Sequence, residues 1–209
     1  MNKIFVIGLP RTGTTSISAA LLEYFKVAHT CYTKRAFELA EVISDCPCFS
    51  DYQQLDKVFP NSKFVYLERN IEQWLPSIQM LLNKMLPSFK SEAYINPVLK
   101  RSFYQTFDLE NLQSPLEAKH LTDCYKRHYQ QVNEYFYDRD DLLSIDVSQS
   151  DSFANLKRFL NIPITEQQQF PHLNIGKLVD GWKDIKHIHK INSYAAGTEG
   201  RKFFDYKAK

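Results

Sequence analysis

The sequence predicts an α/β fold, a three-layer sandwich in which helices cover both faces of a mostly parallel central sheet. Short runs of β-branched and aromatic residues alternate with longer stretches whose apolar residues recur at helical spacing. Such alternation is typical of βαβ units, which form parallel sheets. At 209 residues the chain suits one domain, so we expect a single domain over residues 1–209, with an irregular or helical insertion at about 87–114.

The first half of the chain opens with a strand, a loop and a helix. Residues 4–7 form a short β-branched and aromatic run that ends at glycine, which indicates a buried strand. After it we expect, in order, a helix at 16–25, a short strand at 27–32, a helix at 36–43 and a helix that Asp51 caps and that ends at Val58.

The second half contains the clearest internal strand, residues 63–67. A helix over 71–85 follows, and Pro76 should kink or interrupt it because proline cannot donate the helical hydrogen bond. Beyond the insertion we expect a helix at 115–137, a strand at 142–147, a helix from Asp151 to Leu160, and a tail that is mostly loops with room for one short helix.

Composition excludes several classes of function. The net charge is +2, and no basic run is dense enough to predict a nucleic-acid partner. The apolar run before Gly8 is too short for a signal peptide or a membrane span, so we expect a cytoplasmic protein. Cys46 and Cys48 lie too close together for the usual zinc spacing, and the four cysteines are expected to be reduced and mostly buried. We expect no metal site.

The loop at residues 8–15 lies between the first strand and the first helix, and its glycine and threonine spacing is that of a phosphate loop. Glycines let successive N–H groups turn inward, and the helix behind them adds its positive end. The loop therefore refines the expected fold to one like that of P-loop nucleoside triphosphatases. Thr14 stands where those enzymes have lysine, which disfavours phosphoryl transfer. Arg11 can supply the missing charge, and Thr12, Thr14 and Thr15 offer hydroxyl donors.

A second pattern places Arg69 directly after the strand at 63–67 and Ser77 two turns into the next helix. The carboxyl ends of parallel strands share one crevice, so Arg69 should lie near the phosphate loop. A guanidinium there is a good partner for a second phosphate group.

Together these segments resemble the sulfotransferase family. Gly-Leu-Pro-Arg-Thr-Gly-Thr-Thr-Ser at 8–16 resembles its 5′-phosphosulfate loop, and residues 64–77 resemble its 3′-phosphate motif. Asp45-Cys46-Pro47 is similar to an Asp-x-Pro segment of a small sulfotransferase-like subfamily. The resemblance is close over residues 3–80 and looser at 142–163 and 170–174.

The resemblance implies 3′-phosphoadenosine 5′-phosphosulfate (PAPS) as sulfuryl donor, adenosine 3′,5′-bisphosphate (PAP) as product, and no metal. It implies a 5′-phosphosulfate site of Pro10, Arg11, Thr12, Gly13, Thr14, Thr15 and Ser16. It also implies a 3′-phosphate site of Arg69, Ser77, Arg201 and Lys202, with Lys177 and Lys183 as alternatives to the last two.

Transfer to a hydroxyl or amine requires a general base. Many cytosolic members of the family use a histidine in this neighbourhood, where the present chain has Asp45. We expect Asp45 to be the base, with His29 as the alternative, and Arg11 to be the catalytic cation on the bridging oxygen. The acceptor is expected to be a small molecule or glycan, and a homodimer is left open.

Two other functions stay open on the sequence. One is a nucleotide or small-molecule kinase, favoured by the hydrophobic strand that ends at Asp146. The other is a nucleotide-binding protein without catalytic activity, favoured by the missing histidine. A rise in melting temperature with PAP in the absence of metal would favour the PAPS-dependent transferase over the kinase.

Overall fold

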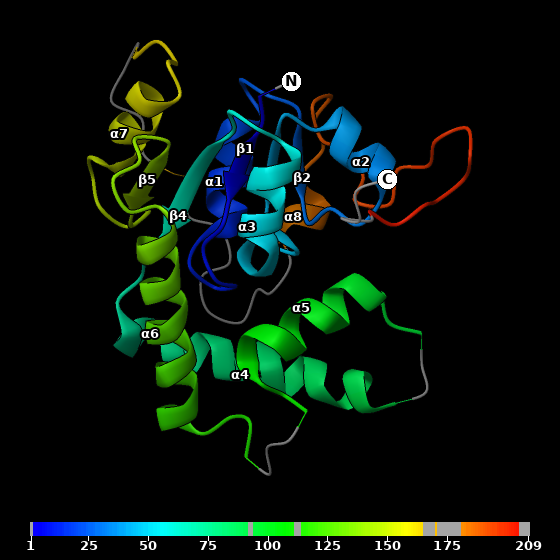
Figure 1. Cartoon of the computed structure of the whole chain (residues 1–209), viewed down its shortest axis with the longest axis vertical. Coiled ribbons are helices and arrows are strands. Elements are labelled where there is room, and N and C mark those ends of the chain that lie inside the picture. The colour runs from blue at the N-terminus through cyan, green and yellow to red at the C-terminus, as the bar shows by residue number, and fades with distance from the viewer. Residues whose placement is uncertain (1, 92–93, 111–113, 165–169, 171–180, 205–209) are drawn as a thin grey trace.

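The structure, a computed structural model, describes residues 2–91, 94–110, 114–164, 170 and 181–204. Its centre is a five-stranded sheet in which all strands run parallel, in the order β2-β3-β1-β4-β5 (Figure 1). The strands are β1 (Ile4–Val6), β2 (Val27–His29), β3 (Val42–Ser44), β4 (Lys63–Leu67) and β5 (Leu142–Ile145). In the register, Phe5 of β1 pairs with Ile43 on one side and with Phe64 on the other.

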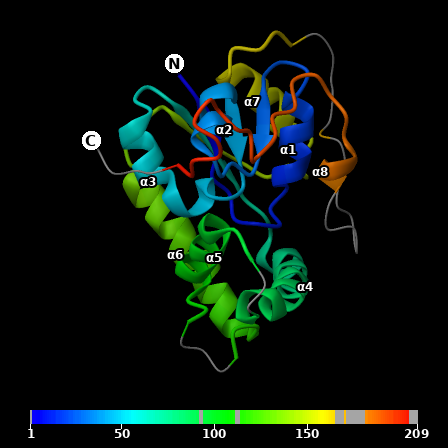
Figure 2. The same cartoon turned by 90° about the vertical axis from the view of Figure 1, so that its right-hand side faces the viewer.

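Helices cover both faces of the sheet, as the sequence predicts for a three-layer α/β sandwich (Figure 2). The helices α2 (Lys34–Leu39), α3 (Cys48–Val58) and part of α6 (Ala118–Tyr135) cover one face. The helices α1 (Thr14–Leu21), α7 (Ser152–Phe159) and α8 (Gly181–Asp184) cover the other. Strand residues alternate between the two cores because successive side chains of a strand point to opposite faces.

A third apolar cluster lies beyond the carboxyl ends of the strands. There α4 (Ile71–Lys90) and α5 (Pro97–Phe107) pack with the first turns of α6, below the sheet in Figure 1. Leu9 of the loop after β1 and Trp74 of α4 belong to this cluster. The insertion expected at 87–114 is therefore helical over α5 and the end of α4, and Pro76 and Pro87 lie inside α4.

Two sequence predictions are wrong. The helix expected over 36–43 ends at Leu39, and Val42–Ser44 form β3, which pairs with both β1 and β2. Ala40 has extended backbone, and the three residues of β3 are buried. The run is too short for periodicity to distinguish strand from helix, and pairing with two neighbours decides it.

The second error concerns Asp51, which the sequence predicts as a helix cap. The helix α3 begins at Cys48, and Asp51 lies in its first turn, where it is buried and paired with Arg101 of α5. The carboxylate thus links α3 to α5, and a local capping pattern cannot predict a contact between two helices.

Candidate functional site

The loop after β1 has the backbone of an anion-binding turn. Arg11 has φ 73° and Gly13 has φ 110°, so two residues of one short loop adopt the left-handed region. Gly13 occupies the N-cap position of α1, and no side chain caps this helix end within the described chain. The first backbone N–H groups of α1 thus lie at the end of the loop without a capping side chain, as in anion sites at helix N-termini.

The structure brings Arg11, Arg69 and Ser77 into one assembly. Nη1 of Arg69 donates to the carbonyl oxygen of Arg11 at 2.6 Å. Nε of Arg11 donates to Oγ of Ser77 at 2.8 Å. The residues that the sequence assigns to the two ends of one nucleotide therefore contact one another, although more than fifty residues separate Arg69 from Arg11.

Two aromatic side chains hold this assembly in place. Nε1 of the buried Trp74 donates to the carbonyl oxygen of Pro10 at 2.9 Å. The hydroxyl of Tyr125 donates to the carbonyl of Arg69 at 2.8 Å and accepts from its backbone N–H at 3.0 Å. The indole and phenol rings also contact each other, with centroids 4.8 Å apart. The helices α4 and α6 thereby fix both the loop and the end of β4.

The site carries two neighbouring positive charges. Burial, and then the charge of Arg69, lower the pKa of Arg11, while Asp45 acts in the opposite direction. Among the described residues, neither guanidinium forms an ion pair with a carboxylate. Two adjacent cations that lack such partners favour an anionic ligand, since an anion relieves their mutual repulsion.

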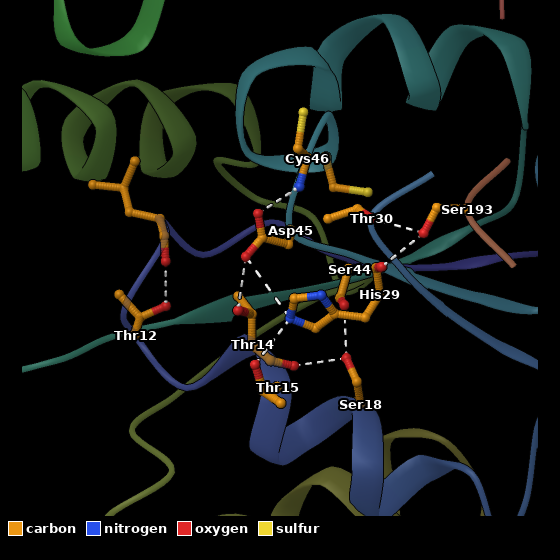
Figure 3. A network of polar contacts seen from close by, with 12 residues as sticks. Thr12, Thr14, Thr15, Ser18, His29, Thr30, Ser44, Asp45, Cys46 and Ser193 are labelled. Carbon is orange, nitrogen blue, oxygen red and sulfur yellow. Dashed lines mark hydrogen bonds and ion pairs between the residues drawn. The ribbon is translucent and has the colours of Figure 1, made fainter. Parts of the chain in front are cut away.

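On the other side of the loop, Asp45 and His29 lie against the start of α1 (Figure 3). Oγ1 of Thr14 donates to Oδ2 of Asp45 at 3.0 Å. Oγ1 of Thr15 lies 3.1 Å from Nε2 of His29. That nitrogen is 3.9 Å from Oδ2 of Asp45, and both side chains are about one-seventh exposed. The base expected from the sequence and its alternative are therefore neighbours.

Residues near the carboxyl terminus support His29. The indole of Trp182 in α8 stacks on the imidazole at 5.5 Å. Oγ of Ser193 donates to the carbonyl of His29 at 3.2 Å and lies 2.8 Å from Oγ1 of Thr30. Thr30 has φ 65°, a costly conformation for a β-branched residue. Strained backbone held by its surroundings is common at functional sites.

The remaining candidates make other contacts. The guanidinium of Arg201 lies 5.8 Å from the ring centre of Tyr194, and Nζ of Lys202 pairs with Glu199. Lys183 is exposed on α8. Lys177 and residues 171–174 fall outside the described residues. The nucleotide-binding roles of Arg201 and Lys202 stay predictions.

Asp146 follows β5, as expected. Its Oδ1 accepts hydrogen bonds from the backbone N–H and the hydroxyl of Ser148. With Glu68 and Arg69 it lines a cavity of about 400 Å³, and burial, then the charge of Asp146, raise the pKa of Glu68. No group of three or more histidine, cysteine, aspartate or glutamate side chains suited to a metal occurs in the part of the chain that the structure describes.

Sequence reasoning missed the supporting residues. From the sequence, no role in the site is assigned to Trp74, Tyr125 or Ser193. Tyr125 is 56 residues from Arg69, and Ser193 is 163 residues from Thr30. No local signal marks a partner at such separations.

Comparison with known proteins identifies the family of this chain. A family model described as a sulfotransferase domain matches residues 27–179, more than half of the chain. Asp45, Arg69 and Ser77 lie in the matched range, and the loop at 8–15 precedes it. No curated protein matches the chain. Over the described residues, no helix combines the length and apolar character needed to cross a membrane.

Proposed function

Since the chain belongs to the sulfotransferase family, a family of transferases, we propose that its sulfuryl donor is PAPS and that its acceptor is a hydroxyl or amine of a small molecule or glycan. As the group donor, PAPS is a substrate that binds to the site and leaves it as PAP.

The contact of Arg69 and Ser77 with Arg11 is the observation that carries this proposal. A donor with phosphate groups at both its 3′ and 5′ ends needs two anion sites at a fixed separation. The uncapped start of α1 supports the 5′ site, and the guanidinium of Arg69 with the hydroxyl of Ser77 supports the 3′ site. A donor with a single phosphate end would leave Arg69 and Ser77 without this role.

In the proposed reaction the acceptor oxygen or nitrogen forms a bond to sulfur, and the bond from sulfur to the bridging phosphate oxygen breaks. PAP leaves with the electron pair of that bond. Arg11 stabilises the negative charge that grows on the bridging oxygen. Asp45 accepts the proton that the acceptor loses, and His29 stands beside it.

Nucleotide binding tests the donor. We expect PAP to raise the melting temperature without added metal, and to do so more than AMP or ATP with magnesium. Arg69→Ala should weaken PAP binding about 10- to 100-fold by calorimetry, because a charged hydrogen bond contributes roughly 1.5–3 kcal/mol. Ser77→Ala should weaken it less, since the lost hydroxyl is neutral.

Arg158→Ala is the matched control, because this exposed arginine on α7 donates to Asn155 of its own helix and lies outside the site. It should bind PAP like the unchanged protein. Preference for ATP with magnesium would instead favour the kinase, whose carboxylate would be Asp146. Tight PAP binding without transfer to any acceptor, water included, would favour a nucleotide-binding protein without catalytic activity.

A further inference from the structure

A cavity of about 300 Å³ lies where α3, α5 and α6 meet, three helices that are neighbours in Figure 2. Among the described residues, none of those assigned to the donor or to proton transfer lines it. Its volume is at the lower end of the range typical of small-molecule sites, so it suits a ligand of about one ring. The side chains that line the cavity decide which chemistry such a ligand needs.

Four glutamine side chains from three helices line this cavity. Gln53 and Gln54 belong to α3, Gln105 to α5 and Gln131 to α6. Each amide carries two donor hydrogens and an acceptor oxygen, and none carries a charge. The wall can therefore donate and accept hydrogen bonds at several places around one small ligand.

The charges at the cavity balance each other. Among the described lining residues, Arg127 and Asp108 are the two that carry a charge, and they pair at 2.8 Å. Arg127 also donates to the carbonyl oxygen of Thr106 at 3.1 Å. An ionic ligand would have to compete with this pair and give up its own hydration, so the lining favours an uncharged ligand.

His128 brings a buried acceptor to the same wall. Its Nε2 lies 2.7 Å from the carbonyl oxygen of Phe49, which only accepts, so Nε2 carries the proton and Nδ1 is an acceptor. His128 is 5% exposed, and within the described chain Nδ1 has no hydrogen-bond partner. Leaving a buried acceptor unpaired costs free energy, and a ligand with an O–H donor recovers it.

We propose that this cavity binds one neutral sugar ring. The amides of the four glutamines bind neighbouring hydroxyl groups, and one hydroxyl donates to Nδ1 of His128. The apolar C–H face of the sugar packs on the side chain of Tyr52, which also lines the cavity. The site is separate from that of the nucleotide, so the inference goes beyond the proposed function and does not depend on the donor.

The test uses the methyl glycosides of glucose, galactose, mannose and N-acetylglucosamine as probes, and follows the side-chain amides of the glutamines by proton–nitrogen NMR. Gln131→Trp fills the cavity from an exposed position on α6. Gln130→Trp is the matched control, because Gln130 is the exposed neighbour that contacts Glu134 of its own helix. The spectra also report whether each variant is folded.

We expect at least one probe to shift the four lining amides with a Kd on the order of 1–10 mM. The amide of Gln79, which donates to the carbonyl of Leu116, should stay in place. Gln131→Trp should weaken this binding at least about tenfold, and Gln130→Trp should leave it unchanged. Methyl glucuronide, which adds a carboxylate to the glucoside, should bind no more tightly than the glucoside.

Three results would overturn the inference. If none of the four glycosides shifts the lining amides at about 50 mM, the cavity holds solvent only. Binding that is equal in Gln131→Trp and Gln130→Trp would place the sugar elsewhere on the protein. If methyl glucuronide binds more than tenfold more tightly than methyl glucoside, the ligand is an anion and the neutral class is wrong.

Discussion

Gly8 has no room for a side chain. A Cβ at this position would lie 2.5 Å from Cβ of Leu67 and 2.9 Å from its backbone nitrogen, and a backbone atom of a paired strand cannot move aside. We expect Gly8→Ala to destabilise the fold by roughly 1–3 kcal/mol through overpacking and to weaken PAP binding as the loop shifts. Gly197→Ala, whose added Cβ meets nothing closer than 3.8 Å, should stay within about 0.5 kcal/mol in urea unfolding. Equal effects of both changes would contradict this account of the loop.

At the residue scale the loop at residues 8–15 also explains why two arginines come so close. Arg69 contacts the loop through the carbonyl of Arg11, so its charge is placed by backbone geometry and does not depend on an opposing carboxylate. Although burial lowers the pKa of Arg11, arginine titrates so far above neutral pH that the guanidinium stays charged. The pair therefore stays a cationic site over the range in which a nucleotide donor is ionised.

At the scale of elements, one ion pair joins the helices beyond the sheet to the sandwich. Asp51 of α3 is 2% exposed and accepts two hydrogen bonds from Arg101 of α5, at 2.8 and 2.5 Å. Arg101→Met leaves this carboxylate buried without its cation, and we expect a loss of about 1–3 kcal/mol, reduced because the arginine itself is 45% exposed. Adding Asp51→Asn should recover part of the loss in a double-mutant cycle. A cycle that shows no coupling would mean that the apolar cluster alone docks α5.

The same helices explain how the site is held rigid. The helix α4 is capped by Asn70, whose side chain accepts the N–H groups of Glu72 and Gln73. This cap directs α4 so that Trp74 reaches the loop carbonyl of Pro10 and Ser77 reaches Arg11. Local capping therefore contributes to the geometry of the candidate donor site.

At the scale of the whole molecule, His128 couples the packing of α6 to pH. The imidazole is buried between α3 and β4, where Nε2 bonds the carbonyl of Phe49 and the ring stacks on Tyr66. Burial lowers the pKa of His128 to about 4. Because an unfolded histidine titrates near 6.5, the unfolded state binds the proton first as pH falls below that value.

The contribution of His128 to the free energy of unfolding should therefore be fully present above about pH 6.5 and should be lost as pH falls toward 4. At about 1.4 kcal/mol per pH unit, the loss from pH 7 to pH 5 is roughly 2 kcal/mol. Urea unfolding at several pH values measures it, and His128→Gln should flatten the dependence in this window. If the free energy of unfolding of His128→Gln depends on pH between 7 and 5 as steeply as that of the unchanged protein, the role of the histidine is wrong.

Asp56 acts at lower pH: its hydrogen bond from Arg139 lowers the pKa of its carboxyl, so its contribution is lost only as pH falls below about 4.

Local sequence patterns were enough to predict the fold class, the strand at 63–67, and the proximity of the loop at 8–15 to Arg69 and Ser77. Each depends on neighbouring residues: a β-branched run, a glycine spacing, or an arginine that must follow a strand whose carboxyl end faces the loop. That residues 1–209 form one domain, and that the protein is cytoplasmic, stay predictions.

Three other features follow from tertiary contacts alone: Val42–Ser44 form β3, Asp51 pairs with Arg101, and the Thr14 hydroxyl contacts Asp45. Each depends on partners distant along the chain. A three-residue run becomes a strand because strands on both sides supply its hydrogen bonds, and a hydroxyl contacts a carboxylate because the sheet order places β3 beside β1. Local sequence patterns cannot predict such partners, since burial and strand pairing arise only when the whole chain packs.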